Sequence, residues 1–356
     1  MRYAVVGAGG IGGLLGTWMA RGGCDVTFVD RRAEHVAAIN EAGMHVEGVR
    51  GVYRIPVQAI TPDQLGMLAP LDGVIVAVKS QDTRAALEQL LPHSTPATAF
   101  VSMQAGMNLG VFEATVGRAR TIGAVPNYGG VAVGPGRLEA GFPNYIHIGE
   151  LDGTFTVRLQ QLQRDLSHWT PTLMTSNIVG AVWSKFVYGS QIMCTAVTDK
   201  ASGEAMAALP HRRVAGALVR EAMRVSDALG IRLEPFDFFD PEPYRVETNG
   251  GTEGLMFWIE HAWPRHEVFR KYGKHAFANT GSIWRWDIVF QKRASEATVF
   301  IETLAQYARQ AGVDIPLNTV LLQLIQEIER GTRQMADDNF DILAAAVHEA
   351  GQALPV

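Results

Sequence analysis

Short apolar runs alternate with helix-like stretches through the first half of the chain. The runs lie at residues 3–7, 25–30, 71–78 and 99–103, and they are rich in the residues typical of buried parallel strands. Helix-like stretches follow the first three of these runs, up to about Arg21, at 32–43 and up to about Leu91. Strands that alternate with helices predict a doubly wound parallel sheet, an α/β fold.

The pattern changes after residue 120, where glycine interrupts the apolar runs. Residues 129–136 and 145–149 predict turn-linked strands, and we expect them at the edge of the same sheet. Residues 154–166 favour a helix and residues 171–175 favour one last strand. Earlier in the chain, residues 44–60 indicate short strands or a hairpin.

From residue 176 onwards the spacing of apolar residues is mainly helical. The helical segments lie at 178–196, 204–229, 294–311, 319–331 and 338–350. We therefore predict an N-terminal Rossmann domain over residues 1–175 and an all-helical domain over residues 176–356. Two domains also suit the length of 356 residues.

Composition excludes several classes of protein. A hydrophobic fraction of 47% excludes a disordered chain, and a net charge of -5 argues against a nucleic-acid partner. Two cysteines, Cys24 and Cys194, cannot form a disulfide framework, which favours a reducing compartment. Glycines interrupt the apolar N-terminus, and no apolar run reaches the roughly 18 residues of a membrane span. We expect a cytoplasmic protein with no membrane partner.

A glycine loop gives the strongest motif. The sequence Gly7-Ala8-Gly9-Gly10-Ile11-Gly12 matches G-x-G-x-x-G, follows a predicted strand and opens a predicted helix. In that context the glycines allow a tight turn, close approach to a pyrophosphate and close packing of helix on strand. The alternative is a glycine-rich turn without a ligand. We interpret the loop as a dinucleotide site.

The residues after the second strand leave the choice of cofactor open. Asp30 stands near the position of an acid that binds a ribose 2′-hydroxyl, which favours NAD. Arg31 and Arg32 follow it, and a guanidinium there can pair with the 2′-phosphate of NADP. A third interpretation makes Asp30 and Arg32 solvated charges at a strand end.

Nearly the whole chain resembles the ketopantoate reductase (2-dehydropantoate 2-reductase) family, which is 6-phosphogluconate-dehydrogenase-like. The resemblance is carried by Gly7–Gly12, Asp30-Arg31, Val78-Lys79, Gln104-Ala-Gly106, Trp183-Ser-Lys185, Gly203-Glu204, Ser295-Glu296 and Ala311–Asn318. It implies a Rossmann domain, a helical domain for substrate and dimerisation, and an active site in the cleft between them. It also implies NADPH-dependent reduction of a 2-keto acid, a step of pantothenate biosynthesis, by a homodimer. Arg31 is then the partner of the 2′-phosphate.

The reduction needs a held nicotinamide, a proton donor and a group that binds the substrate. The resemblance makes Lys185 the proton donor and Glu296 the acid that contacts the substrate hydroxyl and orients Lys185. Without the resemblance, the alternative is that Lys185 is an ordinary helix lysine whose aliphatic stem lies along apolar surface while its ammonium reaches solvent. Lys79 and Gln104 follow successive strands, at the sheet edge where such folds bind cofactor and substrate.

Several substrate-side positions depart from the family pattern. Gly189 and Met193 stand where the family has asparagines, and Ser202 stands at the position of a further family asparagine. Neither Gly nor Met can hydrogen-bond a substrate as an amide does. Arg285 could bind a substrate carboxylate instead. Two alternatives therefore stay open: a related reductase for a bulkier or more apolar keto substrate, and a dinucleotide-sensing protein without turnover.

Residues 235–293 hold a dense set of aromatic side chains. This segment is interpreted as core and interface packing or, alternatively, as a cap over an enlarged substrate pocket. His261, His266 and His275 lie in it, but their spacing matches no ligand set, so we expect no metal. Cys194 is interpreted as a small buried residue.

Overall fold

The computed structural model of the chain describes residues 1–200, 202–237, 239–245, 260, 284, 286–290, 292 and 295–349. The chain divides into two compact units, Met1–Val182 and Trp183–Val356. The division falls inside helix α6 (Ile178–Met193), whereas the sequence pattern placed the boundary just before this helix. No linker marks the change of unit, because a continuous helix runs from one into the other.

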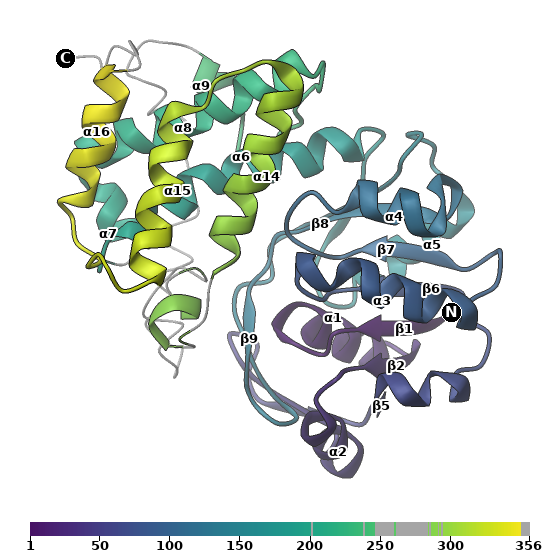
Figure 1. Cartoon of the computed structure of the whole chain (residues 1–356). Helices are drawn as coiled ribbons and strands as arrows, with labels where there is room; N and C mark the ends of the chain where they lie inside the picture. Colours follow the sequence, from purple (N-terminus) through teal and green to yellow (C-terminus); the bar gives the residue numbers. More distant parts are fainter. Residues whose placement is uncertain are drawn as a thin grey trace. The chain divides into compact units, whose positions relative to one another are not determined.

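The first unit is built on one eight-stranded sheet (Figure 1). Its strands are β1 (Arg2–Val6), β2 (Asp25–Val29), β5 (Gln58–Ile60), β6 (Gly73–Val76), β7 (Ala99–Ser102), β8 (Thr121–Pro126), β11 (Ile146–Glu150) and β12 (Thr172–Met174). Their order is β12-β11-β8-β7-β6-β1-β2-β5, and every neighbouring pair is parallel except β8 with β11. The strand order reverses between β1 and β6, as in a doubly wound fold, which confirms the predicted class.

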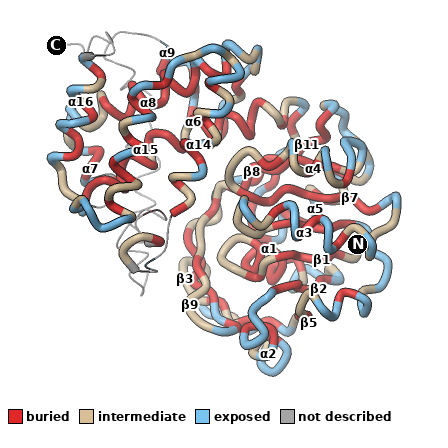
Figure 2. The backbone as a smooth tube through the Cα atoms, viewed as in Figure 1, coloured by how far each residue is buried: buried red, intermediate tan, exposed pale blue. Residues whose placement is uncertain are grey.

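Two apolar cores cover the two faces of this sheet, and the strands appear as buried in Figure 2. Because side chains alternate along a strand, Val5 of β1 faces one core while Ala4 and Val6 face the other. The first core includes residues of α1 (Gly10–Arg21), α2 (Ala33–Ala42) and α5 (Val157–Leu166); the second includes residues of α3 (Thr83–Leu90) and α4 (Leu109–Val116). Short 3₁₀ turns lie at η1 (Pro62–Met67), η2 (Ser80–Asp82), η3 (Leu91–His93) and η4 (Arg118–Arg120).

A second, four-stranded sheet lies against α1. It contains β4 (Tyr53–Ile55), β3 (Met44–Gly48), β10 (Arg137–Ala140) and β9 (Gly130–Gly134), in that order. The expectation that residues 129–136 extend the main sheet is therefore wrong, whereas residues 145–149 do belong to it as β11.

Close backbone contact explains this second sheet. A β-carbon on Gly10 of α1 would lie 1.9 Å from the carbonyl oxygen of Gly130, so helix and strand touch. Leu138 of β10 is fully buried in the same core as Leu14 of α1. Since β9 and β10 cover a face of α1, they remove apolar surface from water there and cannot also extend the main sheet.

The described part of the second unit is helical. Its elements are α6, η5 (Cys194–Val197), α7 (Ser202–Ala207), α8 (Leu209–Ala228), α9 (Glu242–Arg245), the π-helix η7 (Trp286–Phe290), α14 (Glu296–Ala311), α15 (Pro316–Glu329) and α16 (Asn339–Glu349). The helix predicted at 204–229 is broken into α7 and α8, because Pro210 lacks the amide hydrogen that a continuous helix needs. Proline instead suits the first turn of α8.

A buried carboxylate fixes the start of α15. Glu221 of α8 is fully buried and accepts the backbone N–H groups of Leu317 at 3.0 Å and Asn318 at 2.7 Å. The side-chain amide of Asn318 donates to the same carboxylate at 2.8 Å. The first turn of a helix has unpaired N–H groups, and an acid stabilises them. The segment that ends at Asn318 is therefore shaped by a partner almost a hundred residues earlier.

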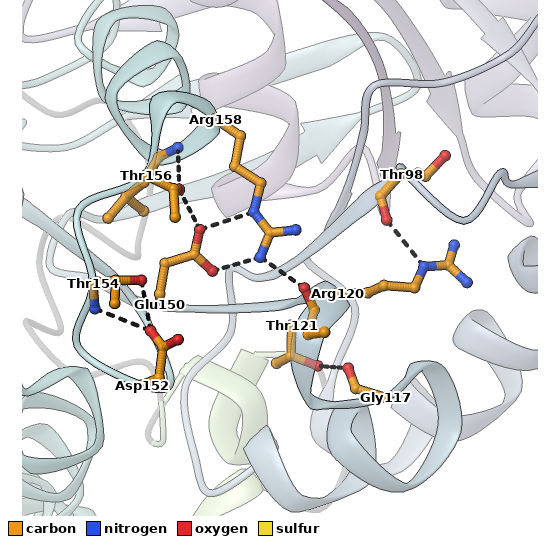
Figure 3. Close-up of polar contacts among 11 residues, drawn as sticks. Thr98, Gly117, Arg120, Thr121, Glu150, Asp152, Thr154, Thr156 and Arg158 are labelled. Carbon is orange, nitrogen blue, oxygen red and sulfur yellow. Dashed lines mark hydrogen bonds and ion pairs between the residues drawn. The ribbon is translucent and has the colours of Figure 1, made fainter.

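Figure 3 shows how the corner between β11 and α5 is held. Glu150 is 4% exposed, and Arg158 donates to both of its oxygens, from Nε at 2.8 Å and from Nη2 at 2.5 Å. Thr156, the N-cap of α5, donates to the same carboxylate at 2.5 Å. Arg158 also donates to the carbonyl oxygen of Ala119 at 2.8 Å, which ties α5 to the turn before β8.

Replacement of Arg158 tests this corner. Arg158→Ala leaves the Glu150 carboxylate buried without its cation, so we expect the free energy of unfolding to fall by about 3 kcal/mol. Urea unfolding measures the loss. The control is Arg164→Ala, which removes an exposed hydrogen bond to Gln161 and is expected to cost less than about 0.5 kcal/mol. Equal losses of unfolding free energy in the two variants would show that the Arg158–Glu150 pair does not hold this corner.

Candidate functional site

The glycine loop follows β1 with the geometry of a phosphate site. Gly7 has φ +96°, a conformation that glycine adopts without strain, and its N–H donates to the Val29 carbonyl at 2.8 Å. A β-carbon on Gly12 would lie 2.2 Å from the Gly7 carbonyl oxygen, so only glycine allows the helix this close. A β-carbon on Gly9 would instead meet nothing within 4 Å. The loop therefore has bare backbone beside open space at Gly9.

The first turn of α1 supplies hydrogen-bond donors at the same place. Gly13 N–H donates to the Gly9 carbonyl at 2.7 Å, so the amides of Gly10, Ile11 and Gly12 belong to the turn that a helix leaves without internal acceptors. The positive end of the helix dipole adds attraction for an anion. These residues fit the pyrophosphate of a dinucleotide.

Ala8, at the centre of the loop, is held on both of its backbone groups. Its N–H donates to Asp30 Oδ2 at 2.9 Å, and its carbonyl oxygen lies 2.9 Å from His35 Nε2. The Nδ1 atom of His35 accepts the N–H of Gly136 at 2.9 Å, so Nε2 must carry the ring proton. His35 thus joins the glycine loop to the β9–β10 turn as a neutral imidazole.

Sequence reasoning missed His35, and no local signal points to it, because Gly136 is distant in sequence. The residue is 1% exposed. Burial lowers the pKa of His35, and the charge of Arg32 acts in the same direction, against hydrogen bonding to Ala8 and the charges of Asp30 and Glu34.

His35 predicts an acid-dependent loss of stability. Its pKa is lower in the folded chain than in the unfolded one, so its contribution is present above pH about 6.5 and is lost as the pH falls below that value. His35→Gln keeps an N–H donor and removes the titration. We expect the Tm of the parent chain to fall towards that of the variant between pH 7.5 and pH 5, as measured by thermal unfolding. If the Tm values of the parent chain and of His35→Gln changed with pH in parallel, His35 would not be the group responsible for the loss of stability.

Asp30 and the two arginines after it have different environments. Arg32 donates to Asp30 from its backbone N–H at 3.0 Å, from Nε at 2.9 Å and from Nη2 at 3.0 Å. Burial alone would raise the pKa of Asp30, but hydrogen bonds and the charge of Arg32 outweigh it and lower the pKa. The Arg31 side chain is 79% exposed, with Nη1 3.6 Å from Asp82. Arg32 therefore neutralises Asp30, and Arg31 reaches into solvent.

Lys79 and Gln104 lie in the loops that follow β6 and β7. Lys79 caps η2 and is partly exposed. Gln104 is buried, and its Nε2 donates to the Val78 carbonyl at 2.7 Å and to Thr83 Oγ1 at 2.8 Å. Both amide hydrogens of Gln104 are therefore used within the first unit. This geometry does not favour donation of a Gln104 N–H to a ligand, and the buried Oε1 of Gln104 remains as an acceptor.

Lys185 lies on α6 in the second unit, among Trp183, Ser184 and Phe186. The rings of Trp183 and Phe186 are 5.8 Å apart, edge to face. Burial lowers the pKa of Lys185 to about 8, against an opposing effect of the Asp237 charge. A lysine with such a pKa can exchange a proton near neutral pH.

Gly189 and Met193, where the resemblance expects amides, take part in an apolar cluster. A β-carbon on Gly189 would lie 3.5 Å from the ring of Phe300 and 3.8 Å from Met193. Met193 is 2% exposed. Phe300 stacks on Phe186 at 5.3 Å and meets Trp284 edge to face at 5.5 Å. This side of α6 presents hydrocarbon where the family pattern has hydrogen-bonding groups.

The other predicted substrate-side residues are placed as follows. Ser202 is buried, with its Oγ 3.2 Å from Thr195 Oγ1. Glu296 is the first residue of α14 and is partly exposed. Asp237, which the sequence reasoning did not single out, is an acid whose charge acts on Lys185. Arg285 and the three histidines at 261, 266 and 275 lie outside the described residues.

The described part of the chain contains neither a metal-binding cluster nor a membrane-spanning helix. Within it, no three His, Cys, Asp or Glu side chains lie together as metal ligands would. None of its helices combines the length and apolar character needed to cross a membrane. Cys24 and Cys194 are not joined in a disulfide, and Cys194 is buried, with Sγ donating to the Gln191 carbonyl at 2.9 Å.

A Rossmann unit with an open glycine loop and a helical unit with a half-buried lysine of lowered pKa are typical of a class, the two-domain oxidoreductases. Family comparison narrows it: residues 3–153 match "Ketopantoate reductase PanE/ApbA", and residues 177–329 match "Ketopantoate reductase PanE/ApbA C terminal". The chain belongs to the ketopantoate reductase family.

Individual relatives are distant in sequence. A 2-dehydropantoate 2-reductase of Halobacterium salinarum is 27% identical over 234 residues, which cover 65% of this chain and 77% of that protein. The crystal structure of a PanE/ApbA family ketopantoate reductase from Ralstonia eutropha JMP134 has a TM-score of 0.73 at 21% identity, covering 94% of this chain and 100% of that one. D-mandelate dehydrogenase with NADH and anilino(oxo)acetate has a TM-score of 0.75 at 16% identity, covering 93% and 99%. These two structures share the fold.

Proposed function

We propose that this protein reduces a 2-keto acid to a 2-hydroxy acid with NADPH. The observation that carries the proposal is Lys185: a half-buried lysine whose pKa is lowered to about 8 by desolvation, in the part of the chain that matches the family's C-terminal domain. Reduction of a ketone leaves an alkoxide, and a partly desolvated ammonium is a suitable acid to protonate it. Keto-acid reduction by relatives such as the Halobacterium salinarum protein supports the same reaction.

The glycine loop would hold the cofactor, which supplies the hydride when bound. Gly9 and the first-turn amides of α1 suit the pyrophosphate, because they combine bare backbone with aligned N–H donors. Arg31 would pair with a 2′-phosphate, and Arg32 removes the repulsion that the Asp30 charge would otherwise exert. This arrangement supports NADPH over NADH. Use of NADH remains the alternative, and a structural neighbour, D-mandelate dehydrogenase, was solved with NADH.

A bulkier or more apolar keto acid is the second candidate substrate. Gly189 and Met193 contribute hydrocarbon where the family pattern has amides, and Phe300 lies against them. An apolar wall favours a substrate with an apolar side chain over one that presents a hydroxyl. The neighbour solved with anilino(oxo)acetate is in keeping with such a preference. Assembly as a homodimer stays a prediction of the sequence resemblance.

The first test is turnover. We expect NADPH oxidation with a panel that contains ketopantoate and aromatic 2-keto acids, followed by cofactor absorbance. Lys185→Ala should lower kcat by at least about 100-fold, because it removes the general acid, and should leave the Kd for NADPH unchanged. The matched control is Lys200→Ala, which removes a surface lysine paired with Asp337 and should keep full activity.

The panel also separates the candidate functions. Preference for aromatic substrates over ketopantoate selects the second candidate, and the reverse preference selects ketopantoate. NADPH binding without turnover of any keto acid would indicate the dinucleotide-sensing protein and overturn the proposal.

Replacement of Arg31 tests the cofactor. Arg31→Ala removes a charged hydrogen bond worth about 1.5–3 kcal/mol, so kcat/KM with NADPH should fall by about 10- to 100-fold. The value with NADH should change less than about threefold, since NADH has no 2′-phosphate. Arg84→Ala, at another exposed arginine of the first unit, is the control. An equal loss with both cofactors would remove Arg31 from this role.

A further inference from the structure

The segment that follows α8 is fixed along one face of α6. Glu234 N–H donates to Ser184 Oγ at 2.8 Å, and Tyr244 OH donates to Gln191 Oε1 at 2.6 Å. Between these two bonds, Tyr188 contacts the aromatic rings of the same segment. Ser184, Tyr188 and Gln191 are spaced four and three residues apart, so they share one helical face. Lys185 is at the border of this face, three residues before Tyr188.

A tight turn in that segment lies against Tyr188. Phe236 and Phe239 exchange two backbone hydrogen bonds, at 3.0 and 2.8 Å, which close the turn. Their rings lie 5.6 and 5.7 Å from the ring of Tyr188. Phe239 also packs on Tyr244 at 5.4 Å, and Tyr244 is 1% exposed. Aromatic contacts and hydrogen bonds therefore fix the position of the turn on α6.

Asp237 occupies the first central position of the turn with φ +41°. Among residues with a side chain, Asp and Asn tolerate this left-handed region best. Strained backbone of this kind occurs often at functional sites, where surrounding contacts hold it in place. The contacts on Phe236 and Phe239 do so here, and they bring the Asp237 carboxylate into the electrostatic range of Lys185.

Other titratable groups also lie on the elements around this part of α6. They are Arg232, Glu234, Tyr244, Asp287, Glu296 and Tyr307, with Tyr188 on α6 itself. Burial raises the pKa of Tyr244 and of Tyr307, which keeps both phenols neutral near pH 7. Among these elements, the turn at Asp237 carries a charge that raises the pKa of Lys185 against the effect of burial.

We propose that Asp237 is a positioning residue that holds the Lys185 ammonium in place and keeps it protonated for transfer to the substrate. This inference rests on the proposed keto-acid reduction. In the step, one N–H bond of Lys185 breaks and an O–H bond forms on the alkoxide left by hydride reduction. The neutral amine then regains a proton from water. Asp237 remains a carboxylate throughout.

Asp237→Asn tests the inference, because Asn keeps the left-handed turn and removes the charge. The pKa of Lys185 is measured without substrate, by competitive acetic anhydride labelling over a pH series and mass spectrometry of the Lys185 peptide. We expect it to fall by about one unit, since a nearby opposite charge shifts a pKa by about 1–3 units. The basic limb of the kcat–pH profile should move down by the same amount, so that kcat lost at pH 7.5 returns at lower pH.

The control is Asp240→Asn, which changes an exposed acid of the same segment and keeps the cap on Glu242 N–H, a 3.0 Å hydrogen bond in the parent chain. It should move neither the labelling pKa nor the pH profile. If Asp237→Asn does not fold, Asp237→Gly takes its place, because glycine also adopts positive φ. An unchanged labelling pKa and an unchanged profile would overturn the inference and leave the reductase intact. A lowered labelling pKa in a chain that reduces no keto acid would support the pairing and overturn the proposed function.

Discussion

The first unit depends on how closely α1 can approach the structures on both of its sides. A β-carbon on Gly16 would lie 2.6 Å from the ring of Phe28 in β2, and one on Gly13 would lie 2.7 Å from the Ala8 carbonyl oxygen. On another side, Gly10 meets the backbone of Gly130. Because glycine stands at each of these three close contacts, the helix can lie between two sheets. Its N-terminus is then fixed at the carboxyl end of β1, the place where doubly wound folds bind phosphate groups.

The same constraint gives Asp30 a role that its position in the sequence does not suggest. With Ala8 fixed between Asp30 and His35, the shape of the glycine loop is set from both sides before any ligand arrives. Fixed donors lose little conformational entropy when a ligand binds. Arg32 completes the arrangement by neutralising Asp30, while the exposed Arg31 side chain extends into solvent with Nη1 3.6 Å from Asp82.

In the second unit, α6 has a different neighbour on each side of Lys185. On one side, Gly189 and Phe300 form an apolar surface, and on the other the turn at Asp237 brings a carboxylate. Burial lowers the pKa of the lysine, and the Asp237 charge limits the fall. An acid tuned in this way would suit proton transfer near neutral pH.

The sequence by itself determined the features that depend on local spacing. The strand–glycine loop–helix order at Gly7–Gly12 needs no distant partner, and alternating apolar runs are enough to specify the doubly wound sheet. Only the tertiary structure decided that β9 leaves the main sheet, that His35 bonds to Gly136, and that the charge of Asp237 acts on Lys185. Each of these contacts joins residues that are far apart along the chain. The spacing of neighbouring residues cannot predict which distant backbone group or charge will lie beside them in the folded chain.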